Sequence, residues 1–127
     1  MHFSVQGNHV HLIVEAESAE QLARGIQGLA IRLARGLNRV MQRRGDVFAD
    51  RYHAHALRTP TEVANAVAYV LGNFVRHASR WGKTVRADWI DPNSSAAISA
   101  EVTGPPLTAD PQTWLLRGGW RRGRSLA

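Results

Sequence analysis

Residues 1–18, MHFSVQGNHVHLIVEAES, decide how the first part of this chain folds. Phe3 to Val5 has the composition of a short strand, and Gln6-Gly7-Asn8 forms a turn of residues that tolerate positive φ. His9 to Ala16 is predicted to be a second strand, so the two segments form an antiparallel hairpin. Side chains alternate along a strand. The two faces of the second strand therefore carry His9, His11 and Ile13 on one side, and Val10, Leu12 and Val14 on the other.

His9 and His11 raise the first question about chemistry. Two histidines one residue apart on a strand point to the same side and can share one metal ion. Two imidazoles leave coordination positions open for substrate and water, as a catalytic metal requires. The alternative is a half-exposed strand with two polar side chains facing solvent. A second pair, His53 and His55, has the same spacing, and spacing alone does not separate the two pairs.

A long amphipathic helix is predicted after the hairpin. Ser18 and Gln21 have the spacing of a capping box, and Gly45 is the predicted end of the helix. Apolar residues recur every three or four positions and form one stripe: Leu22, Ile26, Leu29, Leu33, Leu37 and Val40. The next segment, Val47 to Leu57, is predicted to be a further strand.

A second helix begins at the sequence RTPTEV. Thr59 is a suitable N-cap, Pro60 fits the first helical position, and Glu62 completes a capping box. We expect this helix to run to about Ser79. Its inward residues are predicted to be Val63, Val67, Val70, Leu71, Phe74 and Ala78. Its opposite face is predicted to carry Glu62, Asn65, Tyr69, Asn73, Arg76 and Arg80.

Tyr69 lies on the polar face of that helix, where no core residue is needed. Asn65, Tyr69 and Asn73 are four residues apart and therefore stack on one face. A phenol there could act as a nucleophile if a metal polarises the phosphate that it attacks, and Asn73 could reach the same ion. The alternative is an ordinary surface tyrosine on an amphipathic helix.

Composition restricts the partners. The chain has 127 residues, which is the size of one domain, no cysteine, and 16 Lys and Arg against 10 Asp and Glu. Nearly all cations are arginine, which favours a nucleic-acid partner, with an anionic membrane surface as the weaker alternative. No apolar run is long enough to span a bilayer and no signal peptide is evident, so we expect a cytoplasmic, nucleoid-associated protein without a membrane partner.

The part after Trp81 is rich in turns and loops. Three tryptophans, Trp89, Trp114 and Trp120, are expected to anchor it to the body. The last stretch carries four arginines and no acid, and could be a phosphate-binding arm or a solvated tail. These arginines are Arg117, Arg121, Arg122 and Arg124.

Three segments together resemble a known family. SVQGNHVHLIVEA, VFADRYHAHALRTPTEV and AYVLGNFVRHA are similar to the single-tyrosine HUH transposases, in particular the REP-associated tyrosine transposase (IS200-like) branch. The motif is His9, Val10 and His11, followed by a tyrosine helix in which Asn73 comes four residues after Tyr69. The resemblance covers residues 3–80 and, more weakly, WLLRGGWRRG near the C-terminus. It selects the first histidine pair over the second.

The resemblance implies a mechanism and a fold. It implies that His9, His11 and Asn73 hold Mg²⁺ or Mn²⁺, and that Tyr69 attacks single-stranded DNA beside a hairpin and forms a 5′-phosphotyrosine link. Cleavage and rejoining of this kind serve DNA transposition and recombination of a mobile element. The implied fold is α+β, a ferredoxin-like (RRM-like) two-layer sandwich. DNA contacts are expected from basic residues around the site: Arg44, Arg51, His53, Arg58 and Arg76.

The sequence departs from the family pattern in two places. The family has a strand and a helix before the hairpin, so we expect an N-terminally truncated fold, with residues 1–80 as the partial catalytic domain and 81–127 as a basic extension packing on it. Loss of that strand would expose a sheet edge. Phe74 also replaces the proline common after the asparagine. A catalytically inactive DNA-binding remnant is therefore the alternative function, a metal-binding or interaction module is a third, and the chain could be a homodimer or a monomer.

Overall fold

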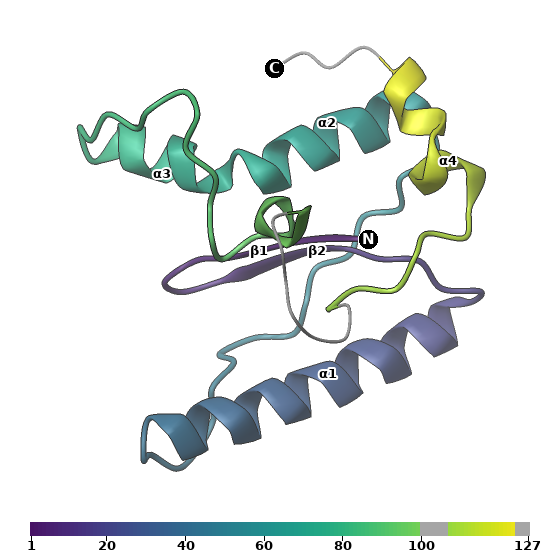
Figure 1. The fold of residues 1–127 in the computed structure, drawn as a ribbon. Coiled ribbons are helices and arrows are strands. Elements are labelled where there is room, and N and C mark those ends of the chain that lie inside the picture. The colour runs from purple at the N-terminus through teal and green to yellow at the C-terminus, as the bar shows by residue number, and fades with distance from the viewer. Residues whose placement is uncertain (100–106, 124–127) are drawn as a thin grey trace. The chain divides into compact units, whose positions relative to one another are not determined.

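The computed structural model describes residues 1–99 and 107–123 and has an α+β architecture with a two-stranded antiparallel sheet (Figure 1). The chain divides into two compact units, which are described separately. The first unit combines Met1–Glu15 with Leu57–Ala127, and the second is Ala16–Ala56. In the described part of the chain, every helix is too short or too polar to pass through a bilayer.

The predicted hairpin is confirmed. Strand β1 (His2–Val5) pairs antiparallel with β2 (Val10–Ile13), and the register places Ser4 opposite His11. The Gln6 N–H donates to the His9 carbonyl at 2.9 Å and closes the turn. The second strand ends at Ile13 and is therefore shorter than the predicted strand to Ala16.

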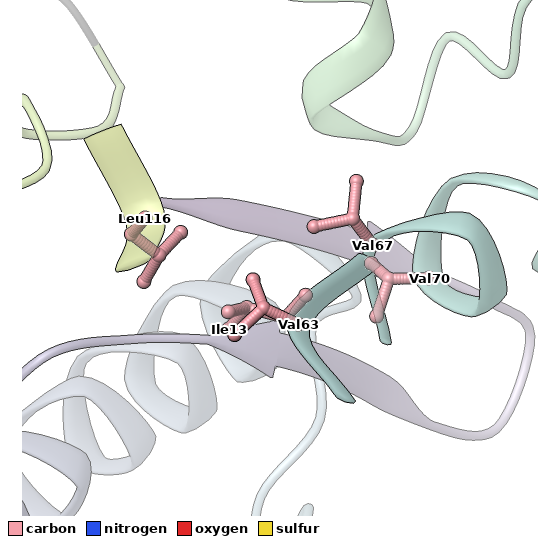
Figure 2. Packing of buried hydrophobic residues seen from close by; sticks show 5 residues of the cluster. All are labelled: Ile13, Val63, Val67, Val70 and Leu116. Carbon is pink, nitrogen blue, oxygen red and sulfur yellow. The ribbon is translucent and has the colours of Figure 1, made fainter. Parts of the chain in front are cut away.

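Helix α2 (Pro60–Leu71) packs on the face of the hairpin that carries Ile13. The predicted cap is confirmed, because Thr59 and Glu62 form a reciprocal capping box with Pro60 in the first turn. Val63, Val67 and Val70 are buried, and burial of such a side chain stabilises the fold by about 1.5–3 kcal/mol. Figure 2 shows the resulting core cluster, which consists of Ile13, Val63, Val67, Val70 and Leu116.

The predicted long second helix is divided at Gly72. Helix α2 ends at Leu71 and α3 (Asn73–Arg80) follows, while hydrogen bonds on both sides of Gly72 are kept. A Cβ at Gly72 would lie 2.9 Å from the Ala68 carbonyl oxygen, so only glycine fits without a shift. The two helices together span the predicted length, and α3 buries Ala78 as expected.

Residues 91–95 cover the outer edge of β1. The Val5 N–H donates to the Asn93 carbonyl at 2.8 Å, and the Phe3 N–H donates to Ser95 Oγ at 3.2 Å. Buried Asp91 links the two segments, because its Oδ2 accepts from Gln6 Nε2 at 3.2 Å. The predicted exposed edge is thus not found at β1. Among the described residues no backbone hydrogen bond reaches the outer edge of β2.

Two short helices close the first unit against α2. Helix α4 (Trp114–Arg117) places Leu116 in the core, and the 3₁₀ helix η2 (Gly119–Arg122) packs Trp120 against it. The Glu15 carboxylate, just after β2, accepts hydrogen bonds from the Gln112 N–H at 2.7 Å and the Thr113 N–H at 2.9 Å. A further 3₁₀ helix, η1, spans Ser95–Ser99.

The tryptophans expected to anchor this part behave differently from one another. Trp120 packs on the core as predicted, and Trp89 stacks on Phe74 with ring centroids 4.4 Å apart. Trp114 is 58% exposed, so the prediction that it anchors the segment is wrong. It follows Thr113 at the start of a four-residue helix whose inward position is taken by Leu116. Arg124 lies outside the described residues.

The second unit consists of helix α1 (Ala19–Val40) and the segment after it. Ser18 caps α1 by accepting from the Gln21 N–H, but the Gln21 side chain donates to Glu17, so only half of the predicted capping box forms. The helix ends at Val40, earlier than the predicted Gly45, because Gln42 takes a positive φ of 50°.

The predicted strand over Val47 to Leu57 is wrong. Residues 47–57 have no regular structure, and all except Val47 and Leu57 are exposed. Alternate positions of this segment mix Phe48 with Asp50, and Val47 with Arg51. Neither face is therefore continuously apolar, and a strand without a buried face or a hydrogen-bonded neighbour is not stable.

Candidate functional site

Polar side chains of the hairpin and of helices α2 and α3 meet over one face of the hairpin. His11 lies on the side of β2 that faces α2. His9, which directly precedes β2, lies on the same side, as the alternation predicts. The consecutive helices α2 and α3 supply Tyr69, Asn73 and His77, which are four residues apart and therefore on one face. We call these five residues the histidine–tyrosine cluster.

The rings of the cluster form a connected chain of contacts. The His9 and His11 ring centroids lie 4.8 Å apart, and those of His11 and Tyr69 lie 5.3 Å apart. On the other side of His9, the His77 ring centroid lies at 5.2 Å. The strand and the helix pair thus bring together side chains that are up to 68 residues apart in the chain, from His9 to His77.

Asn73 is the buried centre of this arrangement. Its side chain is 1% exposed, and its Nδ2 donates to His9 Nε2 at 3.2 Å. The other ring nitrogen of His9, Nδ1, lies 2.7 Å from Asn8 Oδ1. An amide oxygen only accepts, so Nδ1 carries the proton and Nε2 presents its lone pair to Asn73. The histidine is therefore oriented by a neighbouring carbonyl, as metal-ligating histidines commonly are.

The prediction that Asn73 lies on the face opposite the core is wrong. The helix face that carries Tyr69 and Asn73 does not point wholly to solvent, because it packs over the histidine-bearing side of β2. A polar residue can be buried there because the imidazole accepts its hydrogen bond. Tyr69 lies at the border of this contact and is 41% exposed.

Arg76 completes the surroundings of Tyr69. Its guanidinium carbon lies 5.0 Å from the centroid of the Tyr69 ring, in cation–π geometry. The arginine is exposed and has no salt bridge in the described part of the chain. A fixed positive charge therefore lies beside the phenol and can bind an anionic group brought to it.

The electrostatics of the cluster favour neutral imidazole at His11. Partial burial lowers the pKa of His11 below its usual value of 6.5, and the nearby His9 and His77 rings lower it further. A neutral imidazole has a free lone pair, which is the form that a metal ion binds.

Two imidazoles and an amide are side chains of the kinds that bind divalent cations. The side-chain N–H of Asn73 points at the lone pair of His9 Nε2. A flip of the Asn73 amide group would place its oxygen there instead. Among the described residues, no three His, Cys, Asp or Glu side chains are arranged to hold an ion.

The structure places five of the predicted site residues in one group. His9, His11, Tyr69, Asn73 and Arg76 lie in or beside the cluster. Arg58 precedes the first residue of α2, and at 1.5 Å per residue it lies roughly 14 Å or more along the helix from Tyr69. Arg44, Arg51 and His53 belong to the second unit, where they are exposed.

Sequence reasoning missed His77. The signal was present, because His77 comes four residues after Asn73 and eight after Tyr69. It was hidden because His77 does not belong to an H-x-H pair.

No protein-family model matches this chain, and no curated protein or solved structure is significantly similar to it.

Proposed function

We propose that this protein is a metal-dependent single-stranded DNA transesterase that cleaves and rejoins DNA through a 5′-phosphotyrosine intermediate on Tyr69. One observation carries the proposal: the Tyr69 ring lies against His11, in the same cluster as His9 and Asn73. A lone surface tyrosine would not need two imidazoles and a buried amide beside it.

Each residue has a defined part in the proposed reaction. The Tyr69 hydroxyl oxygen attacks the scissile phosphorus and loses its proton to solvent. The bond from phosphorus to the 3′ oxygen breaks, and that oxygen takes up a proton and leaves as a 3′-hydroxyl. The reverse attack by a 3′-hydroxyl releases Tyr69, so strands are rejoined without an energy source. His9, His11 and Asn73 would hold Mg²⁺ or Mn²⁺, which neutralises charge on the phosphate oxygens when bound.

Arg76 is suited to bind the phosphate beside the nucleophile. Its guanidinium lies next to the Tyr69 ring and presents several N–H donors, which match phosphate oxygens. The formal net charge of +6 supports binding to a polyanion over the rest of the surface. Tyr69 is partly exposed, so a flexible single strand could approach it without a deep cleft.

The hairpin with a helix on one face also supports the ferredoxin-like architecture that we propose for the site. In that architecture helices pack on one face of an antiparallel sheet. The pairing of β1 with β2, and the packing of α2 over both strands, agree with this arrangement.

The experiment is a covalent-trapping assay. The protein is mixed with a labelled hairpin oligonucleotide that has single-stranded flanks, in Mn²⁺, and separated on a denaturing gel. We expect a slowly migrating protein–DNA species that disappears with a chelator and in Tyr69→Phe. The chain has two tyrosines, so Tyr52→Phe, which removes the other exposed phenol, is the matched control and should leave the adduct unchanged.

The other outcomes identify the alternatives. A shift on a native gel with no covalent species would support the DNA-binding remnant and contradict the enzyme. Absence of binding at low salt, where phosphate contacts are strongest, would contradict both and leave the third function, a metal-binding or interaction module. An adduct that persists in Tyr69→Phe would assign the nucleophile elsewhere.

A further inference from the structure

His77 is the member of the cluster that the proposed function does not use. It lies on α3, one helical turn after Asn73, and it is half-buried. Its ring contacts His9 on one side, and on the other lies 6.1 Å from the ring of Trp81, which is 70% exposed. Three of the six histidines of the chain thus lie within one group of contacting rings.

The ring spacings match those of imidazoles that share one ion. Two imidazoles bound through metal–nitrogen bonds of about 2.1 Å place their centroids about 4.5–5.2 Å apart, for octahedral to tetrahedral angles. The observed centroid distances are 4.8 Å for His9 and His11, and 5.2 Å for His9 and His77. His9 is common to both pairs, so the rings of His11 and His77 both lie beside its ring.

We propose that His77 is a third imidazole ligand, so that this site takes a nitrogen-preferring transition metal ion such as Co²⁺, Ni²⁺ or Zn²⁺ in preference to Mg²⁺. Three imidazoles and one amide form a nitrogen-rich donor set, whereas Mg²⁺ prefers oxygen ligands and retains its waters. The inference rests on the metal-binding part of the proposed function and specifies which ions it uses.

Binding requires small side-chain movements. The described residues contain no three side chains that already converge on an ion, so His77 must rotate about its side-chain torsions toward His9. Asn73 must also turn its amide, because its Nδ2–H now faces His9 Nε2. Both movements are rotations of side chains that already contact His9.

The test is a Co²⁺ titration of the chelator-treated full-length protein, followed by visible absorbance and without DNA. We expect one Co²⁺ per chain, little displacement by excess Mg²⁺, and binding at least about 10-fold weaker in His77→Ala. His55→Ala removes an exposed histidine of the second unit and is the matched control, for which we expect unchanged affinity. Far-UV circular dichroism checks that each variant keeps its helices.

Two further measurements keep the outcomes distinct. In NMR spectra, Co²⁺ should broaden the ring signals of His77 together with those of His9 and His11, whether or not an alanine variant folds. Equal Co²⁺ affinity in His77→Ala and the wild type, with loss in His9→Ala, would overturn this inference and leave the proposed function intact. No Co²⁺ binding by the wild type, but adduct formation in Mg²⁺, would also overturn it. Absence of both Co²⁺ binding and a metal-dependent adduct would overturn this inference and the proposed function.

Discussion

The chain contains two H-x-H pairs with the same spacing and different structural surroundings. His9 and His11 lie in a paired hairpin, under a helix, and their rings contact Tyr69 and His77. His53 and His55 lie in a segment without regular structure, are exposed, and form no hydrogen bonds within the described residues. The first pair is therefore positioned for joint action, whereas the second is free to rotate in solvent.

The difference shows that spacing has chemical meaning only when the backbone is fixed. Residues two apart point to one side in a strand, but not in an irregular segment. The hydrogen bonds of β1 and β2 fix the first pair, and Asn8 and Asn73 then orient His9 from both sides. Four pairs of variants test this difference, and they are described in order of decreasing expected effect.

The largest difference is expected between a double variant of the first histidine pair and a double variant of the second. His9→Ala with His11→Ala should lower metal-dependent adduct formation at least about 100-fold, because both imidazole ligands are lost. His53→Ala with His55→Ala should change it by less than about twofold. Adduct yield against time on a denaturing gel measures both. Equal losses in the two double variants would show that adduct formation does not depend on the structural surroundings of the first pair.

Asn73→Ala tests whether burial of the amide stabilises the site. The substitution removes the donor to His9 Nε2 from a fully buried position, so we expect a loss of about 1–2 kcal/mol in the free energy of unfolding. His53→Ala, at an exposed position, should change stability by less than about 0.5 kcal/mol. Urea denaturation followed by circular dichroism gives both values. If Asn73→Ala is as stable as His53→Ala, the hydrogen bond from Asn73 to His9 does not stabilise the fold.

Arg76→Ala and Arg51→Ala compare two arginines that were both predicted to contact DNA. Arg76 lies over the Tyr69 ring, whereas Arg51 is two residues from His53 in the irregular segment. Loss of a charge-assisted phosphate contact near the nucleophile should reduce adduct formation about 5- to 10-fold in Arg76→Ala. We expect less than a twofold effect in Arg51→Ala. The reverse ranking would place the DNA path over the second unit.

Glu15→Gln tests how the end of the histidine-bearing strand is held. Partial burial opposes ionisation of Glu15, but hydrogen bonds from Gln112 and Thr113 outweigh it and lower its pKa below the usual 4.5. A lowered carboxyl pKa stabilises the fold at pH values above 4.5, and that stabilisation is lost as pH falls through the lowered pKa.

The expected effect of Glu15→Gln is the smallest of the four. It should cost less than about 1 kcal/mol near pH 7, because the carboxylate is largely exposed, and the difference from wild type should vanish in acid. Thermal melts from pH 3 to pH 7 measure it. Glu17→Gln is the control, because within the described part of the chain its carboxylate accepts a single hydrogen bond, from the Gln21 side chain. A difference from wild type that grows in acid would contradict the assigned direction.

Local sequence signals predicted much of the first unit. The Gln6-Gly7-Asn8 turn, the alternation of β2, and the Thr59–Glu62 capping box are properties of neighbouring residues, and the structure has all three. His9, His11, Tyr69 and Asn73 could be selected for the same reason, since each belongs to a short pattern. The strand predicted at 47–57 failed because a strand also needs a partner and a buried face, which no short pattern supplies.

Local periodicity indicates which residues share a side: two histidines on a strand, and a tyrosine and an asparagine on a helix. Packing in three dimensions makes these two sides face each other, buries Asn73, and adds His77 to the group. The reason is physical. Periodicity fixes the direction of a side chain relative to its own backbone, whereas the contact between β2 and the α2–α3 pair depends on packing between residues about 50 or more positions apart.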